Sequence, residues 1–144
     1  MKEKIFLNAR ILDPSQNMDE SGSVVIDTNG KIKLIGKNVK KKDASASAEI
    51  IDLKNNLIIP GIVDMNAFVG EPGYEYKENF RTLSQAALAG GVTSIVTMPN
   101  TNPIIDNVSM VDFILRRGRD KAKVNLFPSA SLTKKMEGKL MTEF

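Results

Sequence analysis

The alternation of strand-like and helix-like segments after residue 57 is the feature that most limits what this chain can fold into. Three apolar runs have the composition of buried parallel strands, at 57–63, 92–98 and 124–127. Between them, 78–89 and 108–117 carry apolar residues at helical spacing. This β-α-β-α-β order predicts parallel strands joined by right-handed crossovers, and hence an α/β fold.

The residues before this alternation have a different pattern. Short alternating stretches predict four strands, at 4–11, 23–27, 31–35 and 48–53. Asn29-Gly30 predicts a tight hairpin between the second and third, because both residues tolerate positive φ. Segment 37–48, with Lys40-Lys41-Lys42, predicts a mobile, solvated loop. We therefore expect a sandwich-like N-terminal β module over 1–57 and an α/β part over 58–144.

The length limits how much of a larger fold the α/β part can form. A closed (β/α)8 barrel needs about 250 residues, whereas the whole chain has 144. We expect the first three β/α units of a TIM-type barrel, incomplete in this chain. The alternative is an unrelated small α/β ligand-binding domain that is complete at this length.

The residue types that are missing exclude several kinds of chemistry. The sequence has no histidine and no cysteine, which excludes disulfides, thiolate zinc sites and a Ser-His-Asp triad within these residues. Lys and Arg number 20 against 17 Asp and Glu, and most lysines are dispersed, so we predict no nucleic-acid binding. No apolar run reaches membrane-spanning length, and we predict a cytoplasmic protein without a membrane partner.

Function in parallel α/β folds is located where the strands end, which directs attention to 60–73, 98–103 and 127–134. These segments resemble the dihydroorotase branch of the cyclic amidohydrolases. The resemblance covers nearly the whole chain. Its motifs are Pro60-Gly61-Ile62-Val63-Asp64, Glu71-Pro72-Gly73, Met98-Pro99-Asn100-Thr101-Asn102-Pro103 and Leu132-Thr133-Lys134.

The resemblance implies a site whose defining residues are replaced here. In that family the first barrel strand ends in His-x-His, followed by an arginine; the histidines hold zinc, and the arginine binds the substrate carboxylate. The matching positions are Asn66, Phe68 and Gly70. Phenylalanine has no lone pair, and a neutral amide oxygen is a poor zinc ligand. We expect no catalytic residue and no metal ligand, and only Asn100 matches a substrate contact of the family.

The resemblance therefore implies a pseudoenzyme: a non-catalytic dihydroorotase-like protein of de novo pyrimidine biosynthesis, without bound zinc. Non-catalytic members associate with aspartate carbamoyltransferase and support its assembly, so that enzyme is the expected partner and an oligomer the expected full-length form. The alternative is an active zinc-dependent cyclic amidohydrolase with a relocated or single-metal site. We further expect Asp64 to cap a turn, Phe68 to pack as an apolar side chain, and residues 71–73 to shape a loop.

Overall fold

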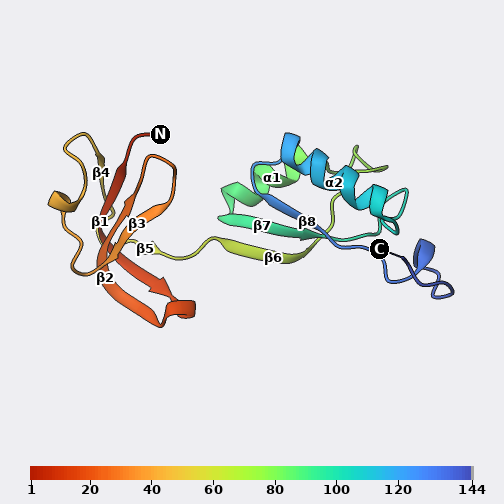
Figure 1. The fold of residues 1–144 in the computed structure, drawn as a ribbon, viewed down its shortest axis with the longest axis horizontal. Coiled ribbons are helices and arrows are strands. Elements are labelled where there is room, and N and C mark those ends of the chain that lie inside the picture. Colours follow the sequence, from red (N-terminus) through yellow and green to blue (C-terminus); the bar gives the residue numbers. More distant parts are fainter. Residues whose placement is uncertain (144) are drawn as a thin grey trace. The chain divides into compact units, whose positions relative to one another are not determined.

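The computed structural model describes residues 1–143, which form two compact units divided between Pro60 and Gly61 (Figure 1). The first unit contains only strands and short 3-10 turns, and the second contains a three-stranded sheet with two helices. None of the helices in the described residues is long and apolar enough to cross a membrane.

The first unit is one mixed sheet with the order β3-β2-β1-β4. Its strands are β1 (Lys4–Asp13), β2 (Met18–Ile26), β3 (Ile32–Gly36), β4 (Glu49–Asp52) and the short β5 (Leu57–Ile58). β1 and β3 pair antiparallel with β2, while β4 and β5 pair parallel with β1. Val24 and Val25 are both buried, in separate apolar clusters, because neighbouring residues of a strand face opposite sides of the sheet. The sheet therefore carries apolar packing on both faces.

Two details of this unit differ from the sequence-based expectations. The β2–β3 hairpin is confirmed, but only Gly30 of the Asn-Gly pair has a positive φ, at 81°. The Asp27 carboxylate fixes the turn instead, by accepting hydrogen bonds from the backbone N–H groups of Asn29 and Lys31. The segment predicted to be a mobile loop is anchored, because Val39 is buried beside Ile5 and Val25.

The strand predicted at 57–63 is wrong as a single element. Pro60-Gly61 divides it into β5, which pairs with β1, and β6 (Ile62–Ala67), which belongs to the second unit. Proline cannot donate a hydrogen bond to a sheet, which is why it separates the two ladders. β6 is also largely exposed among the described residues rather than buried on both faces.

The second unit confirms the predicted parallel α/β arrangement. Its sheet has the order β6-β7-β8, with β7 (Val92–Thr97) between β6 and β8 (Asn125–Pro128), and both pairings are parallel. Helices α1 (Phe80–Ala89) and α2 (Val108–Lys121) cover one face of it (Figure 1). The core between the layers contains Val69, Phe80, Ile105 and Ile114. These are the first three β/α units of a TIM-type barrel.

Asparagine caps fix where both helices begin. Asn79 accepts hydrogen bonds from the backbone N–H groups of Arg81 and Thr82, and Asn107 accepts one from Met110. Each bond satisfies a donor that a helix leaves free in its first turn. Because each cap is the last residue of a loop that follows β6 or β7, the caps also fix where those loops end.

Glu3 should make the β module sensitive to acid. Its buried carboxylate accepts hydrogen bonds from the backbone N–H of Ser45 and from Lys33 Nζ, at 2.9 and 3.0 Å. These contacts lower the pKa of Glu3 from 4.5 to about 2, and the hydrogen bonds with Ser45 have the largest effect. A carboxyl whose pKa is lowered by folding stabilises the fold above its unfolded pKa, and that stability is lost as the pH falls from 4.5 towards 2. We expect Glu3→Gln to flatten the dependence of the melting temperature on pH in this window, measured by circular dichroism. An unchanged dependence would contradict this role for Glu3.

Candidate functional site

Three loops follow the carboxyl ends of the parallel strands, and they form the candidate site. We call them the first loop (68–79, after β6), the second loop (98–107, after β7) and the third loop (129–142, after β8). All three lie at the same edge of the sheet because the strands are parallel. This edge is where the sequence places the family motifs.

The first and second loops are held together through their backbones. The backbone N–H of Asn102 donates to the carbonyl of Pro72 at 3.0 Å. Gly73, with φ of 96°, lies so close that an added Cβ would be 2.1 Å from the Asn102 carbonyl oxygen. Only glycine fits a positive φ together with this close approach. The Glu-Pro-Gly turn and the Met-Pro-Asn-Thr-Asn-Pro loop therefore form one packed structure.

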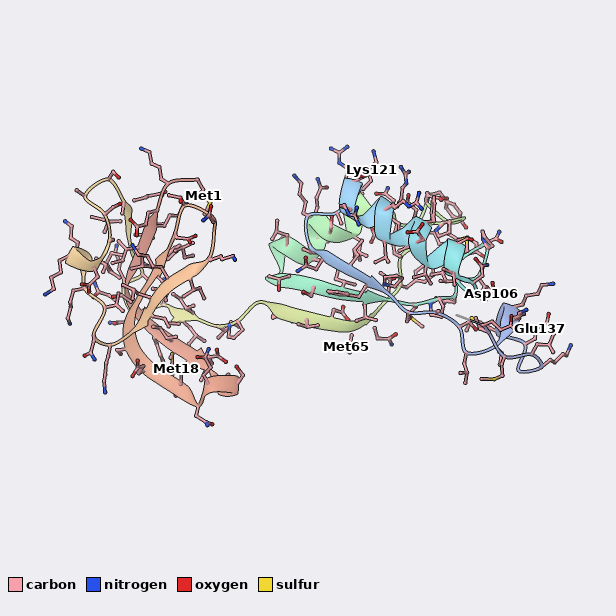
Figure 2. The ribbon with its side chains drawn as sticks, viewed as in Figure 1. Met1, Met18, Met65, Asp106, Lys121 and Glu137 are labelled. Atoms are coloured by element: carbon pink, nitrogen blue, oxygen red, sulfur yellow. The ribbon has the colours of Figure 1, made fainter. Side chains whose placement is uncertain are left out.

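The third loop is attached to the second in a similar way. The backbone N–H of Ser131 donates to the Ile105 carbonyl at 2.7 Å, and that of Lys135 donates to Asp106 Oδ2 at 2.9 Å. The hydrogen bond from Lys135 is the main reason why the pKa of Asp106 lies below its usual value. Asp106 is labelled beside this loop in Figure 2. The carboxylate of Asp106 thus holds the third loop to the second.

The residues at the family's metal positions lie where β6 ends. The pairing of β6 with β7 is irregular between Asp64 and Ala67, and Asp64 Oδ1 accepts a hydrogen bond from the backbone N–H of Asn66 at 3.0 Å. Asp64 therefore caps a local irregularity inside the strand rather than a turn after it. Met65 lies on the side of the sheet away from the helices (Figure 2). Phe68 is 37% exposed, so residues 1–143 do not bury it as expected.

Gly70, at the family's arginine position, is buried in tight backbone packing. A Cβ built on Gly70 would lie 2.2 Å from the carbonyl oxygen of Tyr74 and 2.7 Å from that of Glu78. Real side chains essentially never approach backbone atoms this closely. The first loop therefore folds in a way that requires a residue without a side chain at this position.

Glu71 is a structural residue that the sequence did not identify. Its carboxylate is buried, accepts a hydrogen bond from the backbone N–H of Phe80 at 3.1 Å, and pairs with Arg117 Nε at 2.8 Å. It thus connects the first loop to the start of α1 and to the C-terminal half of α2. The expectation that Glu71 only shapes the loop is too narrow, because this side chain joins three elements. Arg117 lies 46 residues further along the chain, and no local pattern indicates such a pair.

Asn100 lies exposed in the second loop. The loop around it is fixed by the Pro99 carbonyl, which accepts hydrogen bonds from Thr101 and Ile105, and by the Thr101 hydroxyl, which donates to Pro103. No hydrogen bond joins the Asn100 side chain to another described residue, so its amide is accessible to a ligand. Its role as a substrate contact stays a prediction.

The donor set at this edge does not suit zinc. Neither the phenyl ring of Phe68 nor the neutral amide of Asn66 replaces an imidazole. Residues 1–143 also contain no group of three His, Cys, Asp or Glu side chains placed to hold a metal ion.

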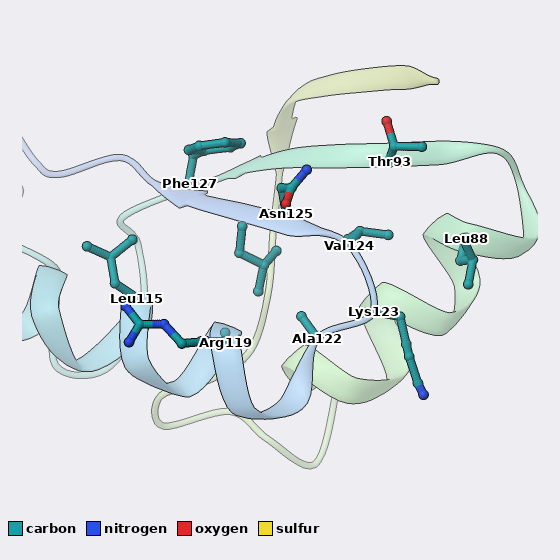
Figure 3. A pocket seen from close by; sticks show the side chains of 11 residues that line it. Leu88, Thr93, Leu115, Arg119, Ala122, Lys123, Val124, Asn125 and Phe127 are labelled. Carbon is teal, nitrogen blue, oxygen red and sulfur yellow. The ribbon is translucent and has the colours of Figure 1, made fainter. Parts of the chain in front are cut away.

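A hollow lies elsewhere in this unit. It has a volume of about 640 Å³ and lies beside β8 and α2, where Leu115, Arg119, Lys123 and Phe127 contribute to its walls (Figure 3). Thr93 and Val124 place it towards the amino ends of the strands. It is therefore separate from the three loops and is not the candidate site.

Comparison with known protein families agrees with this arrangement. The model of the family described as "Dihydro-orotase-like" matches residues 55–144. The chain belongs to this family. The dihydroorotase-like match includes all three barrel strands and all three loops of the candidate site.

Individual relatives extend the match to the β module. The chain is 41% identical to the dihydroorotase of Syntrophus aciditrophicus over 98% of its residues, and 39% identical to that of Aquifex aeolicus over 100%. It spans about a third of the length of these curated relatives, 33% in both cases.

Solved structures show the same fold. The L-hydantoinase of Arthrobacter aurescens matches 92% of this chain with a TM-score of 0.78 at 21% identity, and the chain covers 28% of that structure. The dihydropyrimidinase of Brevibacillus agri matches 91% with a TM-score of 0.72 at 26% identity, and 27% of that structure is covered.

Proposed function

We propose that this protein is a non-catalytic, dihydroorotase-like component of pyrimidine biosynthesis that supports the assembly of aspartate carbamoyltransferase. The proposal rests on which residues stand at three positions at the end of β6 and the start of the first loop. Asn66 and Phe68 stand where the family has zinc-binding histidines, and Gly70 stands where it has the arginine for the substrate carboxylate.

The packing of Gly70 supports this proposal further. A missing side chain alone could be compensated by a neighbouring residue. Here the backbone carbonyls of Tyr74 and Glu78 occupy the space that a side chain at position 70 would need. The loss of a charged bidentate contact costs about 1.5–3 kcal/mol of substrate binding. At the position where the family has a substrate contact, the first loop instead packs its own backbone against Gly70.

Activity measurements test the catalytic part of the proposal. We expect the full-length protein, supplied with zinc, to convert neither dihydroorotate nor carbamoyl aspartate above the blank, and to retain no stoichiometric zinc by elemental analysis. The matched control is the double variant Asn66→His with Phe68→His, which restores two imidazoles and should raise the zinc content. Robust turnover by the unmodified protein that a chelator abolishes would establish the alternative, an active enzyme with a relocated or single-metal site.

The partner requires a separate experiment. We expect the full-length protein to co-purify with aspartate carbamoyltransferase from the same cell and to change its assembly state in analytical ultracentrifugation. If the carbamoyltransferase assembles and works unchanged without this protein, the scaffold role is wrong even where the catalytic result agrees.

A further inference from the structure

A small, strongly basic hollow lies in the β module, far along the sequence from the family motifs. Its volume is about 280 Å³. Its walls come from β1, β2, the segment after β3 and the turn before β5, and no acidic side chain is among them. The side chains that carry its chemistry are Asn8, Ser21, Ser23, Lys37, Lys40, Lys41 and Asn55.

Close backbone packing brings the lysines to this hollow. A Cβ on Gly22 would lie 2.5 Å from the carbonyl carbon of Gly36 and 2.9 Å from the backbone nitrogen of Lys37. Because Gly22 has no side chain, the segment after β3 can lie directly against β2. Glu20 Oε1 then accepts a hydrogen bond from the backbone N–H of Lys37 at 3.0 Å. The position of this basic segment is therefore fixed by β2.

The opposite wall is built by an irregularity in β1. Asn8 has a φ of 55° and lies where the β1–β2 register shifts. Its carbonyl accepts a hydrogen bond from the backbone N–H of Asn55 at 2.7 Å, and its side-chain amide donates to Asp52 at 3.0 Å. Asn8 and Asn55 thus line the same hollow from different parts of the chain.

The lysine side chains at the hollow form no ion pairs, although the carboxylates of Glu20 and Asp43 accept hydrogen bonds from the backbone N–H groups of Lys37 and Lys40. Within residues 1–143, none of the ammonium groups of Lys37, Lys40 and Lys41 lies within 4.0 Å of a carboxylate, although other lysines of the unit, such as Lys4, are paired. Ser23 is only 6% exposed, and its hydroxyl forms no hydrogen bond with the described residues. The Ser23 oxygen is not among the fully buried polar atoms of the described residues, so it can donate to a ligand in the hollow. The hollow therefore offers three positive charges and a hydroxyl without a protein partner.

We propose that this hollow binds the phosphoryl group of a small molecule. A phosphate dianion has several acceptor oxygens, which suits lysine ammonium groups on one wall and hydroxyl and amide donors on the others. The volume fits a small ligand rather than a macromolecule. The site lies in the β module and uses none of the residues at the ends of β6, β7 and β8, so it is independent of the proposed scaffold role.

Titration of the full chain with inorganic phosphate, and separately with adenosine monophosphate, tests the site. Backbone amide resonances of residues 21–23 and 37–41 should shift saturably in NMR spectra with at least one probe. Saturation by phosphate alone identifies free phosphate as the ligand, and tighter binding of the nucleotide identifies a phosphate ester. The absence of saturable shifts with either probe would overturn the proposal.

Two variants and one control separate a built site from general attraction. Replacing Lys37, Lys40 and Lys41 by glutamine should raise the Kd by at least about tenfold, because charge-assisted hydrogen bonds are lost. Ser23→Ala, which leaves the charge unchanged, should raise it by about threefold. The control replaces the exposed Lys2, Lys31 and Lys123 by glutamine, with the same change in net charge, and should alter the Kd by less than about twofold. Equal weakening in the control would contradict a specific site.

Discussion

Replacing Gly70 by alanine is expected to lower the free energy of unfolding by about 3 kcal/mol, which is at the upper end of what overpacking costs. The new Cβ would meet the carbonyl oxygens of Tyr74 and Glu78, and both are backbone atoms that cannot rotate away. Gly70 does not have a positive φ, so the cost is steric and does not arise from a forbidden backbone conformation. The first loop must shift before the methyl group fits.

Urea denaturation monitored by circular dichroism measures this effect, and Gly90→Ala is the matched control. Gly90 follows α1, has a φ of −87°, and an added Cβ would come no closer than 3.6 Å to the atoms around it. We expect Gly90→Ala to change the unfolding free energy by less than about 1 kcal/mol. If the two variants unfold at the same urea concentration, the tight packing around Gly70 is wrong.

The same packing has a consequence for function. An arginine introduced at position 70 would need the same space as alanine and more, so Gly70→Arg should destabilise the first loop rather than recreate a carboxylate clamp. Three substitutions separate this chain from the family pattern at the end of β6 and the start of the first loop. The third of them is tied to the conformation of the loop, because backbone carbonyls of the loop pack against Gly70.

The alternating strands and helices could be predicted from the sequence because their signals are local. The apolar spacing of 78–89 and 108–117 lies within the elements that it defines. The structure confirms both helices, although the second continues to Lys121, and it shows Asn79 and Asn107 as their caps. The prediction for 57–63 was wrong for a physical reason. Its apolar composition describes a strand correctly, but Pro60-Gly61 assigns its two halves to two different sheets.

The candidate site could be predicted only in part. The replacements at Asn66, Phe68 and Gly70 are visible in the sequence because they interrupt a recognisable motif. The connections between the loops are not visible, because they join residues far apart in the chain. The contact between Gly73 and Asn102 depends on how two loops pack, and the pair of Glu71 with Arg117 depends on where α2 lies.

Replacing Glu71 by alanine is expected to lower the free energy of unfolding by about 2 kcal/mol, because it removes a buried carboxylate and leaves its donors without a partner. The Glu71 side chain is 5% exposed, whereas that of Arg117 is 45% exposed. Water can therefore solvate Arg117 in the variant, and the cost stays below that of stranding a fully buried charge. The larger part comes from the Phe80 N–H at the start of α1, which lies in a buried environment and loses its acceptor.

Two further variants show whether burial is the cause. Glu71→Gln keeps an acceptor for the Phe80 N–H and removes the charge opposite Arg117, so its destabilisation should be smaller than that of Glu71→Ala. Asp112→Ala breaks the pair of Asp112 with Arg116 on the exposed surface of α2, and exposed pairs contribute less than about 1 kcal/mol. We therefore expect Asp112→Ala to be the most stable of the three variants, Glu71→Gln to be intermediate and Glu71→Ala to be the least stable. Equal stability of Asp112→Ala and Glu71→Ala would show that Glu71 does not hold the first loop to the two helices.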